Sequence, residues 1–121
     1  MKVLVTGSRE FLDESVIRRE LSTLPVGTII VHGHCREGAD AIADRVASSL
    51  GFEVRRYPAK WNSFSQTFSG HARNRRMVRE EHFPEEPINL CLAFIAGRSS
   101  GTWNCVACVE AEEIEVKKVR Q

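Results

Sequence analysis

Short apolar runs alternate along the chain with segments in which apolar residues recur at helical spacing. The apolar or β-branched runs predict five strands, at residues 3–5, 28–31, 52–57, 89–95 and 114–119. The segments between them predict four helices, at residues 13–24, 39–50, 71–81 and 102–112. Glycine or proline follows the first three helices, as expected where a helix ends. The order of elements therefore predicts an α/β fold.

The alternation also predicts how the sheet is connected. Strands that alternate with helices are joined by right-handed crossovers, which gives a mainly parallel sheet with helices on both faces. The runs around Val3, Ile29 and Leu92 are apolar on both sides, as central parallel strands are. We expect one domain over residues 1–121, a Rossmann-like three-layer sandwich with five mainly parallel strands in the order 3-2-1-4-5. A small mixed α+β domain is the alternative.

Composition narrows the class of protein. The 121 residues are 42% hydrophobic and 27% charged, which is typical of a globular domain. No apolar run approaches the ~20 residues of a membrane span, and the start of the chain predicts a strand and not a signal peptide. A net charge of +1 gives no general attraction to nucleic acid or to a membrane. We expect a cytoplasmic protein with no membrane partner, whose four cysteines are reduced.

Three predicted strands end in polar turns that contain glycine and lead into helices. Glycine lets a backbone approach a ligand closely, and a helix N-terminus offers free N–H groups to a phosphate. In an open parallel sheet these turns share the edge where ligands bind, at the reversal of strand order. Ordinary turns with Ser and Thr caps are the alternative interpretation. The ligand-binding residues predicted in these turns are Thr6, Gly7, Ser8, Arg9, His32, Gly33, Gly38, Asp40, Gly97, Ser100, Gly101 and Thr102.

The predicted helix at residues 71–81 is strongly basic. We place Arg73 in its first turn, just after Gly70, where its guanidinium could reach a phosphate at the strand ends, with Asn74 beside it. A helical wheel turns Arg75 and Arg79 away from this side. We expect those two to face solvent and to pair with the acidic residues at the helix end.

Two tryptophans and a cysteine pair are further candidates. Trp61 lies in the aperiodic segment 59–69, and such long loops are often lids or binding loops; for Trp61 we favour burial over stacking on a base. Trp103 follows the last glycine turn and suits either role. Cys105-x-x-Cys108 has the spacing of half a zinc site, but a second pair is missing, so we expect core cysteines, no metal and no cofactor.

Several of these motifs occur together in a known group of proteins. They are Thr6-Gly7-Ser8-Arg9, Gly38-Ala39-Asp40, Tyr57-Pro58-Ala59 with Trp61, Gly70 with Arg73-Asn74 and Met77, and Gly97 to Gly101-Thr102. In this order they resemble the SLOG superfamily, above all its small single-domain YspA-like, cpYpsA-related branch. The resemblance implies a Rossmann-like fold that senses or processes nucleotide-derived ligands. The second motif is also similar to DNA-processing protein A, and the last to the phosphate loop of lonely-guy phosphoribohydrolases.

The chain departs from those phosphoribohydrolases after the last turn. They carry acidic residues there, whereas Trp103-Asn104-Cys105 follows Gly101-Thr102 here and supplies no carboxylate to cleave an N-glycosidic bond. Asp40 and Glu37 are the catalytic candidates if the protein is an enzyme. Asp40 is better suited to accept hydrogen bonds from ribose hydroxyls, or it complements a helix N-terminus.

We therefore expect binding of a nucleotide-type small molecule at the carboxyl ends of the strands. A hydrolase of an N-glycosidic bond is the second hypothesis, and a nucleic-acid-binding protein is the third. The near-neutral charge argues against the third. Whether the protein forms a homo-oligomer is left open.

Overall fold

The computed structural model describes residues 1–59 and 66–121, with the backbone alone described at residues 66–68. The described strands are β1 (Lys2–Gly7), β2 (Ile29–His32), β3 (Glu53–Arg56), β4 (Leu90–Ile95) and β5 (Val116–Arg120). The described helices are α1 (Glu14–Ser22), α2 (Ala39–Ser49), α3 (Gln66–Glu81) and α4 (Ser100–Ala111). Strands and helices alternate as the apolar pattern predicted.

The five strands form one parallel sheet in the order β3-β2-β1-β4-β5. This confirms the predicted Rossmann-like α/β fold and its strand order. The central strand β1 pairs with β2 on one side and with β4 on the other, so that Leu4 lies between Val31 and Cys91. The order of connection reverses between β1 and β4, and the ends of these two strands therefore frame the crevice of the sheet.

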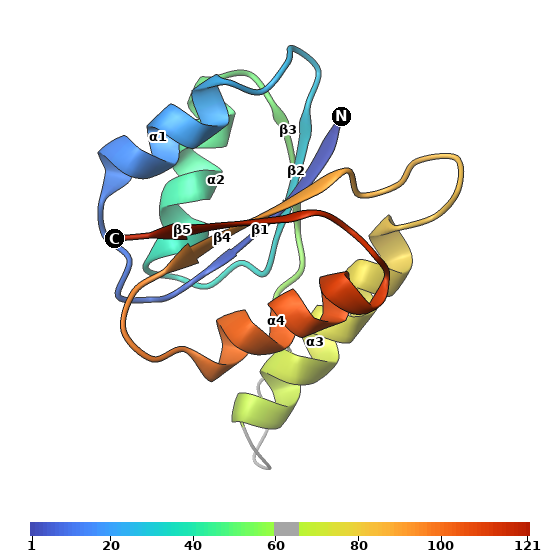
Figure 1. Ribbon diagram of the computed structural model, residues 1–121. Coiled ribbons are helices and arrows are strands. Elements are labelled where there is room, and N and C mark those ends of the chain that lie inside the picture. The colour runs from blue at the N-terminus through green and yellow to red at the C-terminus, as the bar shows by residue number, and fades with distance from the viewer. Residues whose placement is uncertain (60–65) are drawn as a thin grey trace.

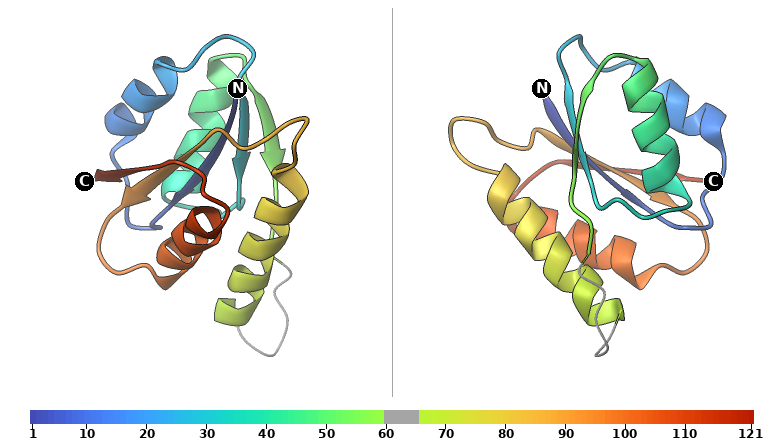
Figure 2. Two further views of the ribbon diagram at one scale, coloured as in Figure 1. Left: turned by 45° about the vertical axis from the view of Figure 1, so that its right-hand side comes forward. Right: turned by 180° about the vertical axis from the view of Figure 1, so that it is seen from behind.

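Helices cover both faces of the sheet, with α1 and α2 on one face and α3 and α4 on the other (Figures 1 and 2). Successive side chains of β1 point to opposite faces. Val3 and Val5 are buried with apolar residues of α1 and α2, whereas Leu4 is buried with residues of α3 and α4. The apolar centre of β1, residues 3–5, therefore supports two separate cores.

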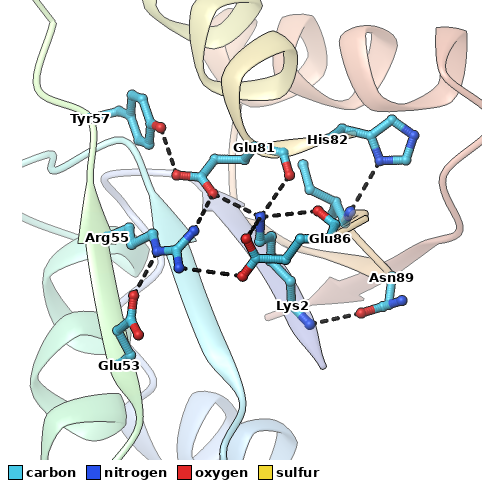
Figure 3. Close-up of polar contacts among 9 residues, drawn as sticks. Lys2, Glu53, Arg55, Tyr57, Glu81, His82, Glu86 and Asn89 are labelled. Atoms are coloured by element: carbon cyan, nitrogen blue, oxygen red, sulfur yellow. Dashed lines mark hydrogen bonds and ion pairs between the residues drawn. The ribbon is translucent and has the colours of Figure 1, made fainter. Parts of the chain in front are cut away.

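A buried ionic network attaches the end of α3 to the sheet (Figure 3). The ammonium group of Lys2 donates to the carbonyl oxygens of Glu81, at 2.7 Å, and Glu86, at 3.2 Å, and lies 2.9 Å from the Glu81 carboxylate. Arg55 and Tyr57 donate to the same carboxylate at 2.9 and 2.6 Å. Glu81 therefore faces the sheet, which corrects our expectation that it pairs with Arg75 and Arg79 on the outside of the helix.

The largest difference from the predicted boundaries concerns α3. We expected its first residue to be His71, but the helix begins at Gln66, so Arg73 lies about two turns inside it. Residues 66–70 carry no apolar periodicity, and Gly70 has a low helix propensity, so the sequence pattern contains no signal for this extension. The rest of the predicted loop, including Trp61, lies outside the described residues.

The remaining boundaries differ by up to two residues. At α4 the shift has a visible cause: Ser99 is the N-cap, and its Oγ accepts the N–H of Thr102 at 3.3 Å, so the helix begins at Ser100 and not at Thr102. Within the described residues, no helix is both long enough and apolar enough to cross a membrane.

Candidate functional site

The three glycine turns meet at one end of the sheet, where they and α3 line an open cavity of about 330 Å³. Figure 1 shows the loops after β1, β2 and β4 at this end. The wall consists of Thr6, Gly7, Arg9, Glu10, Cys35, Asp40, Gly70, His71, Arg73, Arg98, Ser99, Ser100, Gly101 and Thr102. The prediction that these turns share the carboxyl edge of the sheet is confirmed.

Ser8 holds the first turn in place from behind the wall. It is buried, and its Oγ accepts the N–H of Ala96 at 3.0 Å. Its backbone N–H donates to Phe94 O at 2.9 Å, and its own carbonyl oxygen accepts the N–H of Ala39 at 3.1 Å. Ser8 therefore connects the end of β1 to β4 and to the start of α2.

Gly38 is needed for packing between two loops, and not for close approach of the backbone to a ligand, as the glycine turn suggested. Its φ of 77° favours glycine, and a Cβ at this position would collide with the backbone of Ser8 and Arg9. The close approach that requires glycine is between two loops of the chain. Gly38 therefore brings the second turn against the first and puts Asp40 in the wall.

His32 belongs to the interior of the fold. It is fully buried, its Nδ1 accepts the N–H of His34 at 2.9 Å, and its Nε2 lies 2.6 Å from an Asp44 carboxylate oxygen. Because Nδ1 accepts a hydrogen bond, the N–H of the neutral ring is at Nε2, and it donates a hydrogen bond to the Asp44 carboxylate. The Asp44 carboxylate also accepts two hydrogen bonds from Arg56, and these bonds, followed by that from His32, lower its pKa despite partial burial.

Arg73 both lines the cavity and ties α3 to two strand ends. Its Nη1 donates to the carbonyl oxygens of Gly33 and, at 3.3 Å, of Tyr57, and its Nε donates to Asn74 Oδ1 at 2.9 Å. A Cβ on Gly33 would occupy the space of this guanidinium. Arg73 therefore holds the carboxyl ends of β2 and β3, and its side chain is also part of the cavity wall.

Asn74 connects α3 to α4 through hydrogen bonds. It is buried, and its Nδ2 donates to Gly101 O at 3.2 Å and to Asn104 Oδ1 at 3.1 Å. These bonds fix the first turn of α4 against α3. Asn74 therefore supports the site from behind the wall.

The first turn of α4 gives the cavity a positive end. An α-helix leaves its first N–H groups without intrahelical partners, and the positive end of its dipole lies there. Ser99 caps the N–H of Thr102, which leaves those of Ser100 and Gly101 at the cavity. The wall also carries three arginine side chains, at positions 9, 73 and 98, against two carboxylates, Glu10 and Asp40. This arrangement suits an anionic group.

Two buried polar atoms in the wall have no hydrogen-bond partner among the described residues. They are Oδ1 of Asp40 and Nε2 of His71. Asp40 is 5% exposed, and among the described residues its other carboxylate oxygen accepts one hydrogen bond, from the N–H of Cys35 at 3.2 Å. Buried polar atoms in folded proteins are normally paired, so these two are positions at which a ligand would complete the hydrogen bonding.

Eight of the predicted ligand-binding residues line the cavity: Thr6, Gly7, Arg9, Asp40, Arg73, Ser100, Gly101 and Thr102. Six others support the wall from outside it: Ser8, His32, Gly33, Gly38, Asn74 and Gly97. Gly97 (φ 60°) lies against the carboxylate of Glu10. Glu37, a catalytic candidate, is exposed and lies outside the described wall.

The predicted ligand-binding set omits six wall residues: Glu10, Cys35, Gly70, His71, Arg98 and Ser99. Cys35, Arg98 and Ser99 lie within the predicted turns and Glu10 directly follows the first, so taking each turn whole and adding one residue would have found these four. His71 gave no such signal because we placed it at the start of a helix.

All four cysteines lie in the described residues and are free thiols. Cys105 is fully buried, as expected for a core residue, and burial raises its pKa to about 12. Burial, followed by the Asp40 charge, raises the pKa of Cys35 in the wall. In the described parts of the chain, His, Cys, Asp and Glu side chains form no group of three that could hold a metal ion.

Comparison with known proteins supports the resemblance noted in the sequence. Residues 1–64, which include β1 to β3, match the family described as the YspA, cpYpsA-related SLOG family. The chain is also 39% identical over 114 residues to the gene 61 protein of Mycobacterium phage D29, an alignment that covers 87% of this chain and 85% of that protein. The chain therefore belongs to the YspA, cpYpsA-related SLOG family.

Proposed function

We propose that the protein binds a small, phosphate-bearing, nucleotide-derived ligand in the cavity at the carboxyl edge of the sheet. The observation that carries the proposal is the meeting of the α4 N-terminus with Arg9 and Arg98 in one cavity. Free N–H groups, a helix dipole and guanidinium groups together favour a phosphate. The family to which the chain belongs is consistent with a nucleotide-related ligand.

The size of the cavity favours a ligand no larger than one nucleotide. Its volume of about 330 Å³ is near the lower limit of small-molecule sites, which extend from roughly 300 to 1,000 Å³. A dinucleotide would extend beyond the described wall. We therefore expect a nucleoside monophosphate or a fragment of one.

The residues after Gly101-Thr102 favour binding over turnover. Asn104 accepts a hydrogen bond from Asn74, and Cys105 is buried with a raised pKa, so neither offers a reactive group to the cavity. A hydrolase remains the second candidate, because the carboxylates of Glu10 and Asp40 both line the cavity. Incubation with nucleoside monophosphates would separate the two, and we expect no release of free base.

A nucleic-acid partner receives less support. Arg75 and Arg79 are exposed on α3, but Arg76 lies 5.5 Å from the centre of the Tyr57 ring and 3.7 Å from Glu80. With a net charge of +1, the molecule has little excess charge for a phosphate backbone.

Arg98 provides the most direct test, because its side chain is exposed and lines the cavity. Calorimetry with inorganic phosphate and with nucleoside 5′-monophosphates should detect binding, and Arg98→Ala should weaken it about tenfold. The unfolding temperature of the free protein should not change. Arg79→Ala removes the same charge from the outside of α3 and should bind like the wild type. Equal losses for the two variants would indicate a diffuse basic surface, and no binding to the wild type would contradict the proposal.

A further inference from the structure

Asp40 is a wall residue whose buried carboxylate has one oxygen without a hydrogen-bond partner among the described residues. Its carboxylate is nine-tenths buried, yet Oδ1 has no partner in the described part of the chain and Oδ2 has one, the N–H of Cys35. A buried carboxylate is costly unless it is paired or well hydrogen-bonded. Among the described residues, Oδ1 of Asp40 is therefore a buried acceptor without a donor.

The missing partner must be a hydrogen-bond donor, because an ionised carboxylate only accepts. A cationic group would approach three arginine side chains in the same wall and is disfavoured by them. Neutral donors remain, and sugar hydroxyls are the neutral donors that a phosphate-bearing metabolite most often carries. The same wall holds the α4 N-terminus and Arg98 for the phosphate.

We propose that Asp40 binds the hydroxyl groups of a ribose phosphate and makes the site select ribose over 2-deoxyribose. This inference rests on the proposed function and adds the substrate class to it. The phosphate lies at the start of α4, and the hydroxyls donate to Oδ1 of Asp40, which has two unoccupied lone pairs. The loss of one hydroxyl leaves this buried oxygen partly unsatisfied again, so the deoxy sugar binds more weakly.

Base-free probes test the selection, because they remove any contribution from a nucleobase. Calorimetry would compare ribose 5-phosphate, 2-deoxyribose 5-phosphate and inorganic phosphate on the wild type, Asp40→Asn and Glu37→Gln. We expect the wild type to prefer ribose 5-phosphate to the deoxy sugar about tenfold. Asp40→Asn should lose most of this preference and still bind inorganic phosphate. Glu37→Gln, an exposed change three residues away, should behave like the wild type.

The stability of the free protein supplies a second readout. Asparagine keeps an oxygen for the N–H of Cys35 and removes a poorly compensated buried charge, so Asp40→Asn should unfold at the same temperature as the wild type or higher. A purely structural carboxylate would give the opposite shift. Equal affinity of the wild type for the two sugars, or an unchanged preference in Asp40→Asn, overturns the inference alone. Failure of ribose 5-phosphate and inorganic phosphate to bind at all overturns the proposed function with it.

Discussion

Two buried carboxylates of this molecule have opposite surroundings. Glu81 accepts hydrogen bonds from Tyr57, Lys2 and Arg55, whereas within the described part of the chain Asp40 accepts one, from the backbone. Burial by itself raises the pKa of Glu81, but the three donors outweigh it and the pKa is lowered. Glu81 is therefore a group that stabilises the fold in its charged form.

This charge predicts a pH-dependent stability. A lowered pKa in the folded state means that Glu81 contributes fully above its unfolded-state value of 4.5 and loses the contribution as the pH falls through the folded value. Urea unfolding should show a large loss of stability for Glu81→Gln near neutral pH, and the difference from the wild type should shrink below about pH 4.5. Glu80→Gln controls for the loss of one exposed negative charge. A difference that stays constant from neutral to acid pH would contradict this role.

At the scale of an element, α3 is fixed at its middle and at its C-terminal end by polar contacts. The ionic network around Lys2 holds its last residue, and Arg73, at its middle, holds it to the ends of β2 and β3. From the sequence we placed Arg73 in a first helical turn and gave it a ligand-binding role. Its contacts with the carbonyl oxygens of Gly33 and Tyr57 show that it also connects α3 to the sheet.

Arg73→Ala should therefore destabilise the protein. It leaves the carbonyl oxygens of Gly33 and Tyr57 without this donor, which should cost about 2 kcal/mol in the free energy of unfolding. Arg79→Ala, on the exposed side of the same helix, should change it by less than about 0.5 kcal/mol. Urea denaturation of the two variants gives both values. A fully stable Arg73→Ala protein would show that these bonds contribute nothing net.

The elements that sequence patterns predicted well are those whose cause is local. β4 is apolar at every position and β1 at residues 3–5, and α1 has an acidic N-cap, Asp13, followed by apolar residues at helical spacing. The meeting of the glycine turns followed from the strand order. The roles of single residues did not follow from the strand order, because they are set by hydrogen-bond partners elsewhere in the chain. His32 is bonded to Asp44, and Asn74 is bonded to Gly101, 27 residues further along the chain. Such partners are known only once the chain has folded.

At the scale of the whole molecule, the sheet joins the two halves of the chain. The family match covers residues 1–64, but β1 within it pairs with β4 along five residue positions. Neither half can satisfy the backbone of its central strand alone. We therefore expect both halves to unfold together.

Two spectroscopic probes can test this cooperativity. Far-UV circular dichroism reports on all helices and strands, whereas the fluorescence of a Trp61→Phe variant reports on Trp103 alone, in α4 of the second half. In urea the two transitions should have the same midpoint and slope, as for a two-state domain. Separate transitions would show that the halves fold independently, against the expectation of one domain.

The contrast between the two buried carboxylates has a consequence for the history of such proteins. The contacts around Glu81 join the start of β1, the edge strand β3 and the end of α3, so few substitutions there are compatible with folding. Exposed wall residues such as Arg9 and Arg98 carry little of the core. Mutations can therefore accumulate around the cavity and change the preferred ligand while the scaffold persists, and recognition can diverge faster than architecture.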